Sequence, residues 1–267
     1  MLTIELLSIE QIRRRLRTVT VGRVLHLLGE VDSTNARCRD LARAGAPEGT
    51  VVMAEGQRFE RARRGQAWFC PSGVNFYASV LLRQPLRALE LPLFSFLASL
   101  ALVDTFDEYG AQARIKWPND VVVNGRKVAG TLVESSMRGE EVQYIVLGIE
   151  VNLNVEADVR RVVVGSGLFA TSLAALKGHE VDRNAFAAAF LNRLDESLEV
   201  WKIRGAEAVR SAWATRDVLT GKYVEVRGDG ARGCDARVQG LDGGGGLAVQ
   251  DGDGRRYTLV NEEVRPL

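Results

Sequence analysis

The sequence is poor in the residues that build the most familiar catalytic and metal sites. Its 267 residues include only 2 histidines and 3 cysteines. Cys38, Cys70 and Cys234 are far apart and odd in number, so they match neither a disulfide framework nor a metal-ligand spacing. His26 and His179 stand beside no nucleophile or metal motif. Because such cysteine usage is typical of a reducing compartment, we expect a cytoplasmic protein.

Net charge and several common motifs are lacking as well. The formal net charge is +1, so the field of the whole molecule favours neither nucleic acid nor an anionic membrane. There is no Walker loop, GxGxxG, GxSxG or HExxH. No apolar run is expected to approach the roughly 20 residues of a membrane span, and the N-terminus is charged where a signal peptide is apolar. We therefore expect any anion site to be local, and neither nucleic acid nor a membrane as a partner.

The hydrophobic pattern predicts both helices and strands, with an apolar helix packed on a sheet. Helices are expected at 8–18, 34–44, 91–110, 182–205 and 206–216, with Ser8 as a start signal for the first. Strands are expected at 50–55, 75–83, 114–118, 120–125, 126–136 and 141–154. From about Leu219 short strands alternate with glycine turns, which is typical of a small β-barrel. The predicted domains are thus 1–217 and 218–267, and the glycine run 243–246 is interpreted as a flexible turn.

Four arginines fall within seven residues in the segment QRFERARRGQAW, from Gln57 to Trp68. Guanidinium groups are always charged and bind phosphate or carboxylate in bidentate fashion. A loop that carries several of them can clamp a phosphate and exclude water when it closes. Considered alone, however, an arginine-rich loop is more often a solvated surface loop.

Two neighbouring segments, KWPND and NGRKVAG, place cations at one end of the expected sheet. Lys116 could neutralise a phosphate, while Asn119 and Asp120 could hold adenine, ribose or a metal. The alternative is an ordinary strand-end turn, in which Pro-Asn-Asp is common. Lys127 lies on the following strand, where a single lysine is usually a solvated edge residue.

Polar residues also gather in DSTN, residues 32–35, and in GIEVNLN, residues 148–154. Ser33, Thr34 and Asn35 at a helix N-terminus could hold a small polar ligand, although a plain N-cap is the simpler interpretation. Asn152 and Glu150 share one strand face, for which a polar strand end is the alternative.

The order of these motifs resembles that of the biotin–protein ligase family. DSTN, the arginine loop leading into Trp68, KWPND, GRKVAG and GIEVNLN follow one another as they do in that family, over nearly the whole chain. The resemblance implies an α+β fold with a mixed β-sheet and flanking helices, the class II synthetase-like biotin/lipoate ligase fold, with a small C-terminal SH3-like β-barrel. It implies activation of biotin by ATP, with Mg²⁺, to biotinyl-5′-AMP, and transfer to a lysine of a biotin carboxyl carrier protein. A homodimer is a further possibility in the family.

The resemblance also assigns residues, position by position. Its biotin contacts are Ser33, Thr34, Asn35, Gln57, Arg61, Ala62, Arg63, Lys127 and Gly130. Its nucleotide contacts are Arg64, Trp68, Lys116, Asn119, Asp120 and Asn152. Lys127, Arg63 and Lys116 are the expected catalytic groups, and no metal ligand is assigned.

The sequence departs from the family pattern at Glu60, Ala62, Gln66 and Glu150. The family loop reads GRGRRGR, and glycine stands where Glu150 is. Carboxylates beside a polyanion repel it. This leaves, as an alternative, a weakened or inactive relative that binds biotin or its adenylate, or an acyl ligase of altered substrate choice. A lipoate ligase is disfavoured because no GGGxVxHD-like segment is present. A DNA-binding repressor is disfavoured because only some 20 residues precede the ligase-like region, too few for a helix-turn-helix domain.

Overall fold

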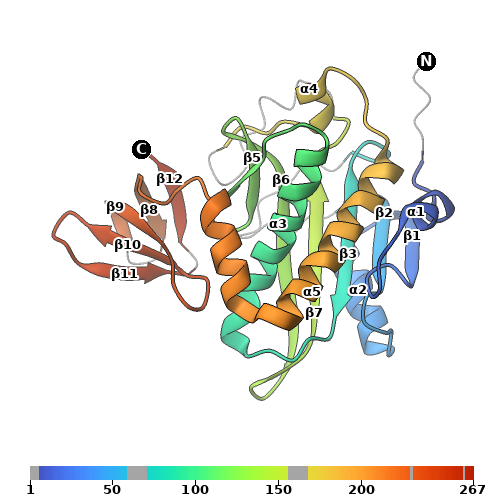
Figure 1. Cartoon of the computed structure of the whole chain (residues 1–267), viewed down its shortest axis with the longest axis horizontal. Coiled ribbons are helices and arrows are strands. Elements are labelled where there is room, and N and C mark those ends of the chain that lie inside the picture. Colours follow the sequence, from blue (N-terminus) through green and yellow to red (C-terminus); the bar gives the residue numbers. More distant parts are fainter. Residues whose placement is uncertain (1–5, 59–70, 156–167, 229–230, 261) are drawn as a thin grey trace.

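The described part of the protein contains two β-sheets, as the computed structural model shows (Figure 1). The structure describes residues 6–58, 71–155, 168–228, 231–260 and 262–267. The larger sheet has the strand order β1-β2-β3-β7-β6-β5-β4 and the smaller one β11-β10-β9-β8-β12. In the larger sheet β1 and β2 are parallel and the other neighbours are antiparallel. The expected mixed sheet and the separate C-terminal β segment are confirmed, while the boundary between 217 and 218 stays a prediction.

The strands of the larger sheet are β1 (Leu25–Val31), β2 (Val51–Gln57), β3 (Phe76–Leu82), β4 (Arg114–Lys116), β5 (Asp120–Val123), β6 (Arg126–Arg138) and β7 (Glu141–Val151). Those of the smaller sheet are β8 (Tyr223–Gly228), β9 (Ala231–Leu241), β10 (Leu247–Asp251), β11 (Arg256–Leu259) and β12 (Glu263–Pro266). The helices are α1 (Ile9–Arg15), α2 (Thr34–Arg43), α3 (Leu91–Glu108), α4 (Leu173–Lys177) and α5 (Arg183–Arg216), with a 3₁₀ turn, η2 (Ala88–Glu90), before α3.

The first two helices begin where the sequence predicts. Ser8 is the N-cap of α1 and accepts a hydrogen bond from the backbone of Gln11. Ser33 caps α2 in the same way through Ala36 N–H. Each hydroxyl satisfies a backbone donor that the helix itself leaves unpaired.

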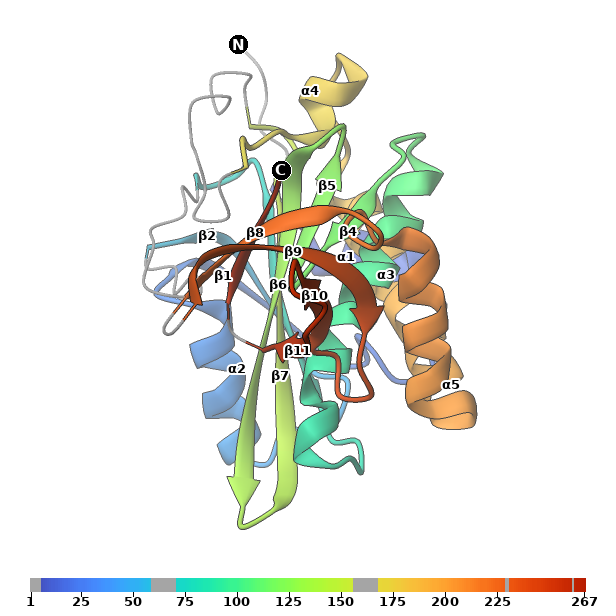
Figure 2. The same cartoon turned by 90° about the vertical axis from the view of Figure 1, so that its left-hand side faces the viewer.

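The two faces of the larger sheet are covered differently. Figure 2 shows α2 on one side of this sheet and α3 with α5 on the other. Phe76, Ala78 and Val80 of β3 belong to the main apolar core on the α3 and α5 side. On the opposite face Cys38 and Ala42 of α2 pack with apolar residues of β2, β3 and β7 in a smaller cluster. This second cluster covers only part of that face, and polar side chains occupy the rest.

One helix in the described part of the chain, residues 88–108, is long and apolar enough to cross a membrane by length and composition. The expectation that no apolar run approaches that length is therefore wrong. Most of this helix is buried inside the protein: Leu93, Phe94, Phe96 and Phe106 are all fully or almost fully covered. A helix that is apolar all round is typical of a core position as well as of a membrane, and α3 is the core helix of this fold.

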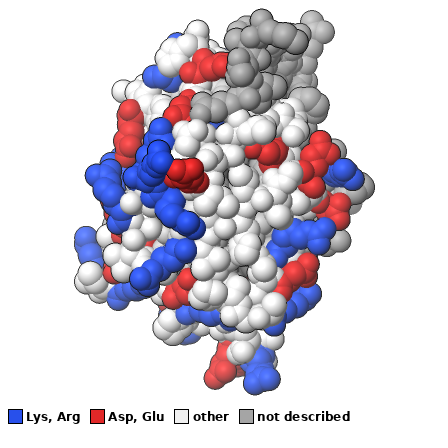
Figure 3. All heavy atoms as spheres, turned by 90° about the vertical axis from the view of Figure 1, so that its right-hand side faces the viewer, with Lys and Arg blue, Asp and Glu red and all other residues white. Residues whose placement is uncertain are grey.

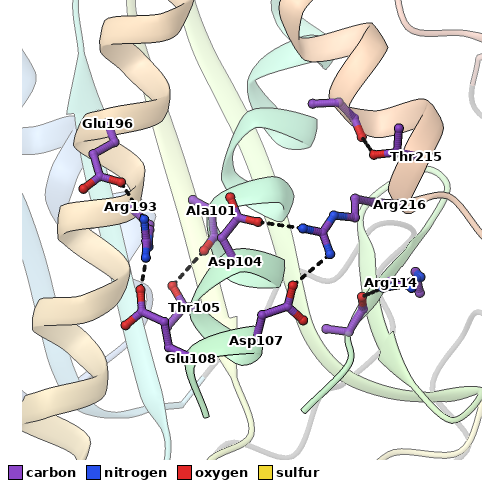
Figure 4. A network of polar contacts seen from close by, with 12 residues as sticks. Ala101, Asp104, Thr105, Asp107, Glu108, Arg114, Arg193, Glu196, Thr215 and Arg216 are labelled. Atoms are coloured by element: carbon purple, nitrogen blue, oxygen red, sulfur yellow. Dashed lines mark hydrogen bonds and ion pairs between the residues drawn. The ribbon is translucent and has the colours of Figure 1, made fainter. Parts of the chain in front are cut away.

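Helix α5 folds back on itself at Gly205, whose backbone lies at φ 61° and ψ −156° inside the helical run. Arg193 before this kink pairs with Glu108 at 2.5 Å, and Arg216 after it pairs with Asp104 and Asp107 at 3.2 and 2.8 Å (Figure 4). In a straight helix the two arginines would be about 35 Å apart. Because both reach the same end of α3, the two halves of α5 flank α3, which agrees with the two helices expected from the sequence.

The smaller sheet is attached to the larger one through the glycine turn at 243–246. Trp117 Nε1 donates a hydrogen bond to Gly245 O at 3.2 Å. Gly245 has φ +89°, and a Cβ there would lie 3.0 Å from the ring of Phe96. Asp242 Oδ1 accepts hydrogen bonds from the backbone of Gly244 and Gly246. The glycines therefore form a closely packed contact, and the interpretation as a mere flexible turn is wrong.

The surface on the side of α1, β1 and α2 carries charges of both signs around an uncharged area (Figure 3). Several arginines in this region pair with acids, for example Arg15 with Asp182 at 3.5 Å and Arg58 with Glu30 at 3.2 Å. Such mixed charge agrees with the near-neutral composition.

Candidate active site

The candidate site lies on the face of the larger sheet opposite α3 and α5. Asp120 of β5 is paired with Gly130 of β6, Gly130 with Glu150 of β7, and Glu150 with Tyr77 of β3. Residues directly opposite one another on neighbouring strands point to the same face. This row, which we call the carboxylate row, therefore brings two acids to one face, with the side-chain-free Gly130 between them.

The ammonium group of Lys127 lies in the carboxylate row. Its Nζ atom is 2.7 Å from Asp120 Oδ1, and only 14% of the lysine side chain is exposed. A Cβ on Gly130 would lie 3.2 Å from that Nζ. The backbone N–H of Lys127 donates to Phe169 O, and its carbonyl accepts from Thr171 N–H. Residues 169–171 therefore cover the backbone of β6 at Lys127. The sequence alternative of a solvated edge lysine is therefore wrong.

KWPND contributes a second cation beside the first. Lys116 of β4 is paired in register with Asp120 and is 2% exposed. Burial lowers the pKa of Lys116, and the carboxylate of Asp120 opposes that shift. Asn119 makes structural contacts instead. Its side-chain Nδ2 donates to Thr131 O at 2.6 Å, and its backbone carbonyl accepts from Thr131 N–H. Asn119 thus braces the turn that holds Lys116 and Asp120.

A second row, two residues further along the same strands, carries the residues of DSTN. Ser79 of β3 is paired with Gly148 of β7, and Asn35 packs on Gly148 so closely that a Cβ there would overlap the Asn35 amide. Ser79 Oγ is 2.6 Å from Asn35 Oδ1 and 2.8 Å from Thr34 Oγ1. We call this the amide row. It lies about 7 Å from the carboxylate row, because two strand residues span that length.

Gln57 completes the amide row. Its Oε1 accepts from the backbone N–H of Thr34 at 2.8 Å and lies 3.1 Å from Thr34 Oγ1. Thr34 and Asn35 are both buried. The plain N-cap interpretation thus accounts for Ser33 alone, since Thr34 and Asn35 are turned into the sheet.

Asn152 lies in a buried network whose centre, Asn75, the sequence analysis missed. Asn75 Nδ2 lies 3.4 Å from Asn152 Oδ1, and Asn152 Nδ2 donates to Thr171 O at 3.1 Å. Asn75 Oδ1 accepts from Leu153 N–H. A polar residue at the start of an apolar strand is a detectable signal, because a buried amide requires partners.

The arginine segment falls largely outside the described residues. Glu60, Arg61, Ala62, Arg63, Arg64, Gln66 and Trp68 all belong to the part that the structure does not describe. The two flanks of this segment meet at the end of β2: Gly73 N–H bonds to Glu55 O, and a Cβ on Gly56 would lie 3.0 Å from Ser72 Cβ. The segment therefore leaves and rejoins the fold beside Gln57 and the amide row.

The arrangement is suited to a ligand with one polar end and one anionic end. The amide row offers hydrogen-bonding groups, and the carboxylate row offers two ammonium groups about 7 Å away. Cations held in a buried setting stabilise phosphate charge far better than cations in water. Within the described part of the chain, no group of three or more His, Cys, Asp or Glu side chains could hold a metal ion.

Comparison with known proteins agrees with this geometry. The sequence profile of the Biotin/lipoate A/B protein ligase family matches residues 28–152. The chain is 36% identical, over 88% of its length and 98% of the relative, to a biotin–[acetyl-CoA-carboxylase] ligase of Paracoccus denitrificans. The fold is similar to a biotin protein ligase of Aquifex aeolicus in complex with biotin and ATP, with a TM-score of 0.74, 24% identity and 92% and 100% of the two chains covered. It is also similar to a Leishmania major biotin protein ligase in complex with biotin, with a TM-score of 0.60, 25% identity and 89% and 98% covered.

Proposed function

This chain belongs to the biotin/lipoate A/B protein ligase family, and we propose that it is the biotin–[acetyl-CoA-carboxylase] ligase of its source. In the first step the carboxylate of biotin attacks the α-phosphorus of ATP, and the α–β phosphoanhydride bond breaks. The products are biotinyl-5′-AMP and pyrophosphate. In the second step a lysine amine of the carrier attacks the acyl carbon, an amide forms, AMP leaves and the amine loses a proton.

The observation that carries this proposal is the pair of adjacent rows on one face of the sheet. The amide row would take the polar ring of biotin through Thr34 and Gln57, which Asn35 supports through Ser79, while Ser33 caps the helix that carries them. The valeryl chain would run toward Gly130, where the missing side chain lets the end of Lys127 lie so close that a Cβ would be 3.2 Å from its Nζ. The biotin carboxylate would then meet the ammonium group that lies against Asp120.

Each cation has a separate part in the first step. Lys127 would orient the biotin carboxylate and stabilise the charge that develops on the α-phosphate. Lys116 would face the nucleotide, with Asn119, Asp120 and Asn152 shaping that side. Arg61, Arg63 and Arg64, with Ala62 and Trp68, would cover the adenylate, because the flanks of their segment meet beside Gln57. A covered mixed anhydride is protected from water until the carrier lysine arrives.

Mg²⁺ is expected to enter with ATP. This ion is usually held by substrate phosphates, several waters and one or two carboxylates. Asp120 and Glu150 are the carboxylates of the carboxylate row, so the donors present fit an ion carried by phosphate rather than one held by the protein alone. When bound, the ion would neutralise phosphate charge.

A weakened ligase is the second candidate, and Glu150 is the observation that favours it. This acid stands in the carboxylate row directly opposite Gly130, where its charge would repel the phosphates. The change Glu150→Gly separates the two candidates: a weakened ligase would gain adenylation rate or adenylate affinity, whereas a fully active one would gain nothing.

The proposed function is tested by labelling a carrier. Purified protein is incubated with biotin, ATP, Mg²⁺ and a biotin carboxyl carrier domain, and a matched carrier with the target Lys→Arg serves as control. We expect one biotin per carrier, on that lysine only, and release of pyrophosphate and AMP. Formation of neither adenylate nor labelled carrier would reject the ligase; adenylate without labelled carrier would support the weakened relative.

A further inference from the structure

Two charged residues outside both rows, Arg39 of α2 and Glu134 of β6, are bound to the amide row. Arg39 Nη1 donates to Glu134 Oε1 at 2.6 Å, and Asn35 Nδ2 donates to Glu134 Oε2 at 3.0 Å. The two charged side chains are partly buried, with 31% and 26% exposed. The proposed function assigns neither of them a role.

The carboxylate of Glu134 determines which way the Asn35 amide points. An ionised carboxylate only accepts hydrogen bonds, so the Asn35 NH₂ group must face it. The carbonyl Oδ1 then faces Ser79, whose hydroxyl is 2.6 Å away. Because the Asn35 amide also packs on Gly148, where even a Cβ would not fit, the side chain has no room to move aside.

The direction of each further hydrogen bond follows from the first. Ser79 has a single proton, which its hydroxyl shares between Asn35 Oδ1 at 2.6 Å and Thr34 Oγ1 at 2.8 Å. Thr34 donates its own proton to Gln57 Oε1 at 3.1 Å. Thr34 Oγ1 therefore has only a lone pair left for a ligand. Gln57 Oε1 already accepts from Thr34 N–H, so Gln57 offers its NH₂ group.

We propose that Arg39 and Glu134 are positioning residues that fix the direction of the hydrogen bonds in the amide row. The row then presents to biotin one acceptor, Thr34 Oγ1, beside one donor, Gln57 Nε2. This inference rests on the proposed function. A cyclic urea carries an N–H donor next to a C=O acceptor, and it is complementary to that pair. A ligand that lacks the N–H would leave one lone pair of Thr34 Oγ1 without a donor, and a buried acceptor site without a donor is unfavourable.

The test compares Glu134→Gln with wild type. A neutral amide can present either its oxygen or its NH₂ group to Asn35, so the Asn35 amide is free to flip. The donors and acceptors of the amide row are then no longer fixed. We expect the Kd of biotin to rise roughly tenfold, the Kd of ATP to stay within about twofold, and discrimination against biotin methylated at a ureido nitrogen to shrink. Arg39→Lys keeps a donor to Glu134 and should lose less affinity than Arg39→Ala.

A matched control is available on the same helix. Asp40 of α2 pairs with Arg37 and Arg43 at 3.9 and 3.7 Å, and all three side chains are more than half exposed. Asp40→Asn removes an ion-pair partner from α2 without touching the amide row, and we expect biotin affinity to be unchanged. Thermal melting of each variant separates lost folding from lost affinity.

The outcomes are distinguishable. If wild type binds biotin and Glu134→Gln binds it within twofold, the positioning role is rejected while the ligase stands. The role is also rejected if Glu134→Gln weakens biotin and methylated biotin by the same factor, because the polarity of the row then does not matter. If wild type itself binds no biotin by calorimetry, the proposed function fails first and the inference falls with it.

Discussion

The two faces of the larger sheet differ in what they bury. The face toward α3 and α5 buries mainly aliphatic and aromatic side chains, such as Phe76 and Val80, with the buried ion pair of Arg183 and Glu55 as a charged exception. The opposite face buries Asp120, Ser79 and Asn35, and each of these polar side chains has a partner on that face. Burial of apolar area stabilises a fold, whereas burial of charge costs free energy that ion pairing offsets only in part. The comparison teaches that stability and chemistry are assigned to opposite sides of one sheet.

The largest expected effect comes from the apolar face. Phe186 of α5 packs its ring against Phe76, Phe106 and Tyr109, with centroids 5.5 to 6.1 Å apart. Phe186→Ala should lower the free energy of unfolding by about 3–5 kcal/mol, because it removes an aromatic ring from a packed core. Denaturant titration measures this loss. Ile203→Ala on the same helix, where the side chain is 82% exposed, should change it by less than about 0.5 kcal/mol.

The biotin affinity of Phe186→Ala tests whether packing on the apolar face influences binding on the polar face. In folded Phe186→Ala protein, well below its melting temperature, the Kd of biotin should equal that of wild type. A large loss of biotin affinity at full folding would show that the two faces are coupled.

The second effect concerns the polar face. Lys127→Met should lower the rate of adenylation about 10²–10³-fold, because a preorganised cation at the reacting phosphate is removed. It also leaves Asp120 buried beside an apolar side chain, so the melting temperature should fall. The double change Lys127→Met with Asp120→Asn should restore the melting temperature and leave adenylation slow. Pyrophosphate release follows the rate, and a double variant with wild-type activity would contradict the assignment.

A smaller effect is expected at Lys116, where burial lowers the pKa. In the alkaline range between that lowered pKa and the ordinary lysine pKa, the unfolded chain binds more protons than the folded one. Wild-type stability contributed by this group therefore rises as the pH rises through that range. Lys116→Met lacks the buried charge, so it should be more stable than wild type by about 1 kcal/mol near pH 7.

The advantage of Lys116→Met should narrow at higher pH, and ATP affinity should fall at every pH. Melting curves between pH 7 and 10 measure the first property and calorimetry the second. An advantage that grows with pH would have the wrong sign for this account.

The smallest effect is expected at the surface pairs of Figure 4. Arg216 is partly exposed and contacts Asp104 and Asp107, which are also exposed in part. Arg216→Ala should change the free energy of unfolding by less than about 1 kcal/mol, because solvent screens such pairs. Added salt should reduce the difference further. A loss of unfolding free energy as large as that of Phe186→Ala would mean that the fold of α5 depends on the ion pairs of Arg216.

Much of the fold could be predicted from local signals. The helix starts at Ser8 and Ser33, the strand segments from β2 to β7 and the change in composition near Leu219 were all visible as capping residues and hydrophobic periods. For strand β1 the sequence indicated only that His26 is a strand residue, without bounds, and the short helix α4 was not predicted. The kink at Gly205 was visible only as the break between two expected helices, because the return of α5 along α3 is a tertiary contact.

The candidate site was predicted as a set of motifs but not as two rows. Sequence patterns indicated Lys116, Asp120 and Lys127. The pairing of Asp120, Gly130 and Glu150 depends on strand register, which cannot be deduced from any single motif. Asn75 and Glu134 act through neighbours distant in sequence, so they were missed. Dimerisation, cytoplasmic location and the lack of nucleic-acid binding stay predictions.

The central claim is that the polar face binds biotin in the amide row and activates it at Lys127. Calorimetry on one sample, with biotin titrated first and ATP with Mg²⁺ second, tests it most directly. The account predicts saturable biotin binding in wild type and in Lys127→Met, followed on ATP addition by one equivalent of adenylation heat that Lys127→Met evolves about 10²–10³-fold more slowly than wild type. Equal rates of heat evolution in both proteins, or no biotin binding in wild type, would contradict it.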